Sequence, residues 1–318
     1  MENYSYNSFM LQMEGLKVAQ DSTYTVFFLL FISYVFIMIL DVGILVIIIL
    51  DKNLHQPMYL LFCNLPVSDI IGTTQILPRV LSDILLPPSE RIISYYECVV
   101  QAFTAHIFGT TSHTVLIIMA FDRYVAICHP LRYTAVMTNA MMVKLTVSAW
   151  GVPFVLVACL LGLTVRLNRC RTLITSPFCD NASLFKLSCE SSLINNIYGL
   201  TFTVLLFIVS IGSMVLTYAN IAAVCLRSKS KALNNKALKT CSTHLVVYLI
   251  MGLSGITHIT LHRFPQLSNF RKLSAILFII IPSSLNPIIY GLQSREMRKF
   301  LFDIFHSKKC WPSHKSMQ

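Results

Sequence analysis

Seven long apolar runs constrain the fold of this chain more than any other feature. They lie at about residues 24–50, 58–86, 98–127, 141–163, 194–226, 237–261 and 272–292. An α-helix needs about 20 such residues to cross a bilayer. Only helices and closed barrels satisfy their own backbone hydrogen bonds in lipid, and barrel strands alternate apolar and polar residues. These runs do not alternate, so the sequence predicts an all-α membrane protein, a bundle of seven transmembrane helices.

Composition and charge agree with a multi-pass membrane protein. Only 12% of the 318 residues are charged, whereas soluble domains carry about 25%. The net charge of +11 does not indicate a nucleic-acid partner, because the basic residues are scattered over loops and form no stripe. Seven spans place the two termini on opposite sides. With the N-terminus outside, 15 of the 25 basic residues face the cytoplasm, as the positive-inside rule favours.

The sequence divides into three parts. Residues 1–23 form an extracellular N-terminus without a cleavable signal peptide, residues 24–292 span the membrane, and residues 293–318 form a cytoplasmic tail. Apolar residues recur at helical spacing from Ser294 to Phe305 beside basic ones. This pattern predicts a short amphipathic helix on the inner membrane surface, with Cys310 beyond it as a palmitoylation candidate. Asn3 and Asn181 begin Asn-x-Ser patterns and are predicted glycosylation sites.

Four of the ten cysteines fall in regions predicted to be extracellular, where disulfides form. These are Cys98, Cys170, Cys179 and Cys189, and four cysteines allow three pairings. The other six are expected to stay reduced. The sequence contains no zinc-ligand spacing, no HExxH or GxSxG motif and no phosphate-binding glycine loop. We therefore expect neither an enzyme nor a cofactor, apart from a sodium ion discussed below.

Four motifs carry a family resemblance. They read LHQPMY at 54–59, MAFDRYVAICHPL at 119–131, KALKTCSTHL at 236–245 and PSSLNPIIY at 282–290. In this order, and over nearly the whole chain, they closely resemble the olfactory receptors, a family of rhodopsin-like G-protein-coupled receptors. The long second outer loop and the sequence His262-Arg263-Phe264 resemble the class I, fish-like branch, which is associated with water-soluble odorants.

The resemblance implies a function and a set of partners. Such a receptor sits in the plasma membrane, binds a small odorant in the outer half of the bundle, and activates a stimulatory, olfactory-type G protein that raises cyclic AMP. The resemblance also implies that Cys98 pairs with Cys179 and Cys170 with Cys189, which would fold the second outer loop as a lid over the ligand.

The resemblance assigns an activation switch to the inner half of the bundle. Asp122 and Arg123 would form an ion pair that is held at rest and freed on activation; alternatively, the pair only anchors the helix at the interface. The remaining switch residues would be Tyr124, Tyr218, Asn286, Pro287 and Tyr290. The expected G-protein contacts are Arg123, Lys236, Lys239 and His244, although ordinary positive-inside charge is the alternative explanation for the basic residues.

A polar site is expected in the middle of the bundle. Ionisable residues are costly within a membrane span and usually functional, and Asp69 matches the family's sodium-site aspartate. By the same resemblance, Ser112 and Asn286 would lie nearby. Asp41 stands where the family usually has Asn, and two carboxylates in a low-dielectric core cannot both ionise cheaply. We expect Asp41 to be a neutral donor to Asp69, or the pair to hold a cation; alternatively, Asp41 faces elsewhere.

The ligand site is expected between the outer halves of spans three, five, six and seven. Arg263, at the outer end of span six, offers a rigid fork of donors to a carboxylate, and His106 would be a second donor. Counting back from Arg263 at helical spacing adds Ile259, Ile256 and Gly252. We hypothesise an anionic or strongly polar odorant. The alternatives are a solvated or ion-paired Arg263 and a His106 satisfied within the bundle.

Two more histidines are candidates for the ligand site, and three alternative functions remain open at this point. His113 and His258 are candidates for the pocket or for packing, with packing favoured for His113. A class I receptor for a metabolite or hormone outside the nose is not separable by sequence. A transporter or channel is a distant alternative, because the chain shows neither an inverted repeat nor a chain of intramembrane charges.

Overall fold

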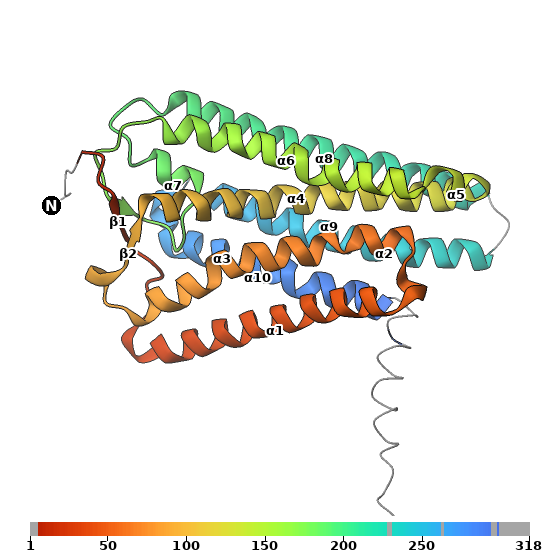
Figure 1. Cartoon of the computed structure of the whole chain (residues 1–318), viewed down its shortest axis with the longest axis horizontal. Helices are drawn as coiled ribbons and strands as arrows, with labels where there is room; N and C mark the ends of the chain where they lie inside the picture. The colour runs from red at the N-terminus through yellow and green to blue at the C-terminus, as the bar shows by residue number, and fades with distance from the viewer. Residues whose placement is uncertain (1–5, 228–230, 262–263, 294–297, 299–318) are drawn as a thin grey trace, which may run out of the picture.

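A computed structural model describes residues 6–227, 231–261, 264–293 and 298 of the chain. Seven long helices lie side by side along the long axis of the molecule (Figure 1). Each is long and apolar enough to cross a membrane. They are α1 (Thr23–Leu50), α3 (Asn64–Leu85), α4 (Tyr95–Cys128), α6 (Asn139–Val165), α8 (Leu193–Arg227), α9 (Lys231–Leu261) and α10 (Ser268–Gln293). The seven predicted spans are confirmed, with most ends within three residues.

Short helices join the long ones. They are α2 (Pro57–Phe62), which leads into α3, α5 (Tyr133–Val136) in the second inner loop, and α7 (Asn181–Phe185) in the second outer loop. Local signals set several helix starts. Ser94 and Glu97 form a capping box at the start of α4, and the side chain of Thr138 accepts a hydrogen bond from the Met141 backbone at the start of α6. Such caps satisfy backbone N–H groups that no helical turn can reach.

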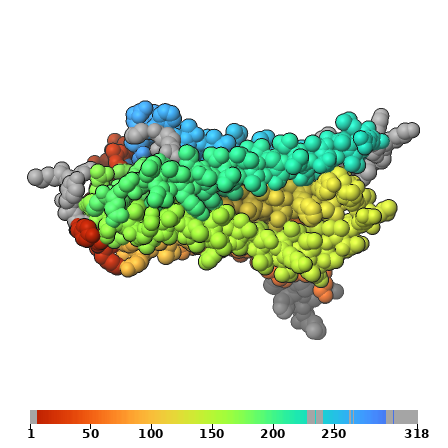
Figure 2. Space-filling model, turned by 90° about the horizontal axis from the view of Figure 1, so that it is seen from above, coloured from red at the N-terminus to blue at the C-terminus, as the bar shows by residue number. Residues whose placement is uncertain are grey.

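The outer surface of the bundle is apolar, as a lipid-facing surface must be. On α8, the side chains of Ile208 and Leu216 are 61% and 67% exposed, whereas Ser210 between them is fully buried. Helices α6 and α8 lie alongside each other over one face of the molecule (Figure 2). Polar residues therefore collect between the helices, where they must find partners within the protein.

A small sheet covers the extracellular end of the bundle, and the sequence analysis missed it. Strand β1 (Met10–Met13) lies between β2 (Ile92–Ser94), its antiparallel partner, and β3 (Leu173–Ile174), its parallel partner. The prediction of an all-α protein is therefore correct for the membrane part only. Residues 1–23 are not a simple tail, because Leu11 and Met13 of β1 are each only 1% exposed.

Two disulfides fasten the same end of the molecule. The bond between Cys98 and Cys179 ties α4 to the second outer loop, and it confirms the predicted pairing. The structure also pairs Cys170 with Cys189 within that loop. The predicted amphipathic helix, the palmitoylation site Cys310 and the glycosylation site Asn3 lie outside the described residues.

The alternation of side chains on β1 generates a testable prediction. We expect Met13→Asp to lower the melting temperature of the detergent-solubilised protein by roughly 5–10 °C, because it buries an unpaired charge. The matched control is Met10→Asp on the same strand, where the native side chain is 48% exposed. Equal melting temperatures for the two variants would contradict a packed N-terminal strand.

Candidate functional site: an outer cavity and an inner mouth

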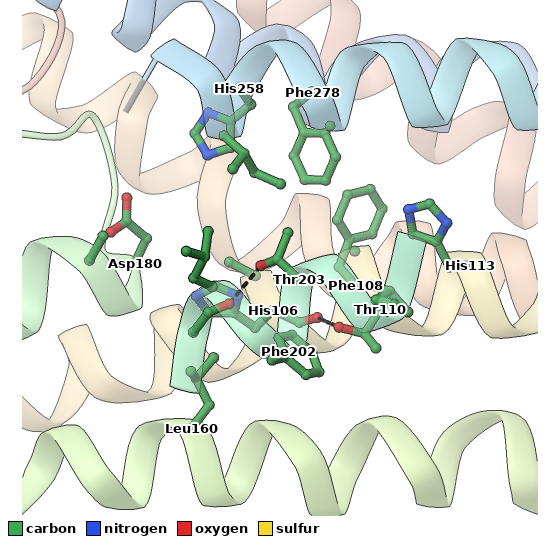
Figure 3. Close-up of a pocket in the computed structure, with 18 of the residues that line it drawn as sticks. His106, Phe108, Thr110, His113, Leu160, Asp180, Phe202, Thr203, His258 and Phe278 are labelled. Carbon is green, nitrogen blue, oxygen red and sulfur yellow. Dashed lines mark hydrogen bonds between the residues drawn. The ribbon is translucent and has the colours of Figure 1, made fainter. Parts of the chain in front are cut away.

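The outer half of the bundle encloses a cavity of about 300 Å³. Its wall is mainly apolar, since six phenylalanines line it together with aliphatic residues of α4, α8, α9 and α10. Figure 3 shows Phe108, Phe202 and Phe278 around this space, with His106 and His258 nearer its outer edge. The second outer loop supplies the remaining side. An enclosed apolar space of this size, with a few polar groups at one edge, suits a small organic molecule.

His106 lies in the cavity wall, as the sequence analysis expected, but one ring nitrogen is already engaged. Its Nε2 accepts a hydrogen bond of 3.2 Å from the backbone N–H of Asn181. That bond places the proton of a neutral ring on Nδ1, by assignment from the network. His106 therefore links α4 to the loop helix α7 as well as facing the cavity.

Two charged residues of the second outer loop also line the cavity, and the sequence analysis missed both. Asp180 follows Cys179 directly, so the disulfide fixes its position. Its carboxylate accepts hydrogen bonds from the Ser183 backbone at 2.6 Å and from the Ser176 hydroxyl at 3.2 Å. Lys186 lines the same side of the cavity. The outer edge of the cavity thus carries groups of both charge signs.

Helix α9 turns to the cavity a face that includes the predicted Ile259 and the candidate His258 but neither Ile256 nor Gly252. The structure places Gly255, His258 and Ile259 in the wall, at the i, i+3 and i+4 spacing of one helical face. His258 stacks on Phe278 with ring centres 5.6 Å apart.

Two residues of the predicted ligand set are therefore wrong, because they do not line the cavity. Ile256 is 45% exposed on the outside of the bundle. Gly252 is buried, but it lies about one turn inward from the lining residues. The count began from Arg263, which lies outside the described residues, and its steps of 4, 3 and 4 drifted off the face that α9 turns inward.

The inner end of the cavity is formed by His113. This side chain is 4% exposed and lines the cavity, so the prediction of packing alone was incomplete. It packs edge-on against Phe207, with ring centres 5.2 Å apart. Its Nδ1 lies 3.3 Å from the Ser210 hydroxyl.

Asn181 does not fit its predicted role as a glycosylation site. Its side chain is 4% exposed, and its Oδ1 accepts a 2.6 Å hydrogen bond from the Thr164 hydroxyl. A glycan would need the amide nitrogen in solvent. The Asn-x-Ser pattern here forms the first turn of α7 instead, with Asp180 as its N-cap.

The middle of the bundle contains the predicted polar site in altered form. Asp69 accepts hydrogen bonds from the Ser283 hydroxyl at 3.1 Å and from the Asn286 amide at 3.2 Å. Ser283 was not predicted. The Ser112 hydroxyl donates to the Phe108 carbonyl of its own helix at 2.8 Å, and its place in the polar site stays a prediction.

Asp41 is the least satisfied group in that polar site. It is fully buried on α1, and among the described residues neither carboxylate oxygen has a hydrogen-bond partner. It does not donate to Asp69, as one form of the prediction required, although the two carboxylates interact electrostatically. A buried carboxylate without a donor needs a proton or a cation. Either would neutralise Asp41, so a sodium ion shared by Asp41 and Asp69 stays a prediction.

The cytoplasmic mouth is held by a compact polar cluster. The Arg123 guanidinium donates from Nε to Asp122 at 2.9 Å and makes a second contact through its terminal nitrogen. The other oxygen of Asp122 accepts a 2.8 Å hydrogen bond from the Tyr133 hydroxyl of α5. Burial raises the pKa of Tyr133, and the Asp122 carboxylate raises it further, so the hydroxyl stays a donor. Sequence reasoning missed Tyr133.

The other predicted switch residues lie deeper in the bundle. His244, predicted as a G-protein contact, is 2% exposed and forms a hydrogen bond with the Tyr218 hydroxyl, so that prediction is wrong for this conformation. Tyr290 is 4% exposed and packs on Phe62, with ring centres 4.6 Å apart. Tyr124 lies at the mouth, with its hydroxyl 3.2 Å from His129. The side chains of Lys236 and Lys239 lie outside the described part of the chain.

Comparison with known proteins decides the family. Residues 30–308 match the model of the family described as Olfactory receptor. The chain is 33% identical to human Olfactory receptor 52P1 over 84% of each chain. It is 34% identical to human Olfactory receptor 52J3, over 83% of this chain and 85% of the relative. The chain belongs to the olfactory receptor family. Human Olfactory receptor 4E1 is also 34% identical, over 91% of each chain.

Membership of this family establishes what kind of protein the helix bundle is and what it binds in general terms. The receptor is a seven-span, non-enzymatic G-protein-coupled receptor of the plasma membrane with its N-terminus outside. Its likeness to the group 52 receptors places it in class I. As in the family generally, an odorant is its ligand and a G protein is its cytoplasmic partner.

The cluster at the mouth generates a second prediction. We expect Tyr133→Phe to raise ligand-independent signalling, because it removes a donor from the carboxylate that holds Arg123. A hydrogen bond to a charged group is worth about 1.5–3 kcal/mol, which shifts a two-state equilibrium roughly ten- to a hundred-fold. The measurement is cyclic AMP in unstimulated cells, normalised to surface receptor. Tyr24→Phe, at a residue 71% exposed on α1, is the control; equal basal signals in the two variants would refute the role of Tyr133.

Proposed function

We propose that this receptor detects a small, water-soluble odorant with an apolar body and one polar or anionic group. We further propose that it activates a stimulatory, olfactory-type G protein and so raises cyclic AMP. The observation that carries the ligand proposal is the aromatic cavity of about 300 Å³ with its polar outer edge. Apolar surface drives the body of the ligand into the cavity, and the few polar groups set its orientation.

The polar edge narrows the choice of head group. Lys186 favours an anion, whereas the carboxylate of Asp180 disfavours one nearby. A neutral group that both donates and accepts hydrogen bonds would suit both residues. An anionic ligand would depend more on Arg263, which we retain as the proposed acid anchor on its sequence position alone.

Two glycines of α9 provide a direct test of the ligand site. A Cβ atom added at Gly255 would lie 3.4 Å from the Phe278 ring and 3.6 Å from the Phe207 ring, whereas one at Gly252 would meet nothing within 4 Å. We expect Gly255→Val to fill the cavity and lower agonist potency about five- to a hundred-fold, since overpacking typically costs 1–3 kcal/mol. Gly252→Val is the matched control with the same helix propensity.

The assay uses cells that report cyclic AMP, first screened with water-soluble acids and with neutral alcohols and esters of equal chain length. A larger loss of potency in Gly252→Val than in Gly255→Val would move the ligand site back to the face predicted from the sequence. If acids are the preferred agonists, Arg263→Ala should weaken them selectively over the neutral analogues. An unchanged ranking of acids and neutral compounds in that variant would remove Arg263 as the anchor.

Leu131 supports the proposed G-protein contact. It lies in the second inner loop, one residue before Arg132 and two before Tyr133, and its side chain is 98% exposed. A large aliphatic side chain held out from a structured cytoplasmic loop gains about 1.5–3 kcal/mol when a partner buries it. We propose that the G protein is that partner.

We expect Leu131→Ser to reduce agonist-stimulated cyclic AMP about five-fold or more at equal surface expression, because less apolar surface is buried in the complex. Leu131→Met, which keeps the apolar volume, should retain the response. Cells lacking the stimulatory α-subunit should give no signal with any variant. A normal response from Leu131→Ser would exclude the contact, and a normal response in the deficient cells would exclude the proposed coupling.

A further inference from the structure

We propose that His113, Ser210 and Tyr248 form a hydrogen-bonded relay that links the floor of the odorant cavity to helix α9 and holds the resting state. We call these three residues the floor relay. The inference rests on the proposed function, because it assumes that the cavity binds the odorant. It assigns a positioning role to three residues, two of which, Ser210 and Tyr248, do not line the cavity.

The geometry of the floor relay is direct. The Ser210 hydroxyl lies 3.3 Å from Nδ1 of His113 and 2.6 Å from the hydroxyl of Tyr248. The three residues come from three helices, α4, α8 and α9. His113 is also in edge-on contact with the Tyr248 ring, with centres 6.0 Å apart. Only His113 of the three faces the cavity (Figure 3), so a ligand can reach the floor relay at one point.

Because the three side chains are buried, breaking their hydrogen bonds costs free energy that water cannot restore. Ser210 is fully buried, and His113 and Tyr248 are 4% and 6% exposed. In a low-dielectric interior a polar group that loses its partner carries the full cost of desolvation. Helices α8 and α9 therefore cannot move apart at this level without breaking a bond that water cannot replace. A buried network of this kind favours discrete arrangements over gradual ones.

A second joint between the same helices lies farther inward. His244 is four residues, about one turn, before Tyr248 on α9, and it forms a hydrogen bond with Tyr218 of α8. Tyr218 is in turn eight residues, about two turns, beyond Ser210. The two helices are thus joined on matching faces, once beneath the cavity and once near Arg123, whose charge acts on His244.

Outward of Tyr248, no hydrogen bond between described residues joins the next turn of α9 to α4 or α8. Gly252 has no side chain, and a Cβ atom added there would meet nothing within 4 Å. Tyr248 is therefore where α9 meets α4 and α8 just below the cavity. A ligand that shifts His113 weakens the outer joint and leaves the inner one as the remaining hydrogen-bonded joint between α8 and α9, which transmits occupancy toward the cytoplasm.

The test uses the full-length receptor without added ligand. We expect Tyr248→Phe to raise basal cyclic AMP about five-fold, since one buried hydrogen bond is lost. Ser210→Ala should raise it at least as much, because it removes that bond and the contact with His113. The double variant should be no more active than Ser210→Ala alone, because Tyr248→Phe breaks a bond that Ser210→Ala has already removed. Ser213→Ala is the matched control, since that hydroxyl bonds to the Val209 carbonyl of its own helix.

A second readout does not depend on any G protein. Cys241, at the inner part of α9, is a free thiol that is 8% exposed. In membranes, maleimide should label it about five-fold faster in Ser210→Ala and in Tyr248→Phe than in the unaltered receptor, with Cys241→Ser giving the background. Faster labelling without a cyclic AMP signal would uphold the floor relay while refuting the proposed coupling. Unchanged labelling in both variants, or additive effects in the double variant, would overturn the floor relay.

Discussion

The structure depends on one constraint: a polar group inside a lipid-embedded bundle has no water to bond with, so it must find its partner on another helix or within its own. The receptor meets this requirement at three levels along its axis. Asp69 bonds to two donors of α10, Asp122 bonds to Arg123 and Tyr133, and Ser210 bridges His113 and Tyr248. A further hydrogen bond, between Tyr218 and His244, joins α8 to α9 farther inward than Ser210.

Apolar packing and polar hydrogen bonds contribute differently to the stability of this bundle. Apolar packing in a bilayer gains little from the hydrophobic effect, because lipid tails are as apolar as the side chains they replace. Polar joints therefore decide which helices stay together and which arrangement of the bundle is favoured. Asp41, with two buried carboxylate oxygens and no donor among the described residues, marks the level at which a proton or a cation takes part in that decision.

The extracellular end is held together by covalent bonds and strand pairing as well as by helix packing. Disulfides and a three-stranded sheet hold the second outer loop and the N-terminal segment against the bundle. They fix Asp180 and Lys186 at the cavity edge and close the space above the aromatic wall. The ligand site is thus built from rigid helix faces on the inside and a fastened loop on the outside, as pre-organised binding requires.

The sequence by itself determined the number of spans, the orientation, the family and the switch motifs at the mouth. These follow from local properties, namely the length of apolar runs, the distribution of charge, and short motifs that act through neighbours in the chain. It could not determine which face of α9 lines the cavity, because a helical count accumulates error from an uncertain starting residue. Nor could it place strand β1, Tyr133 or the floor relay, or show that Asn181 is buried. Each of these depends on contacts between segments distant in sequence, and only the packed tertiary structure brings those segments together.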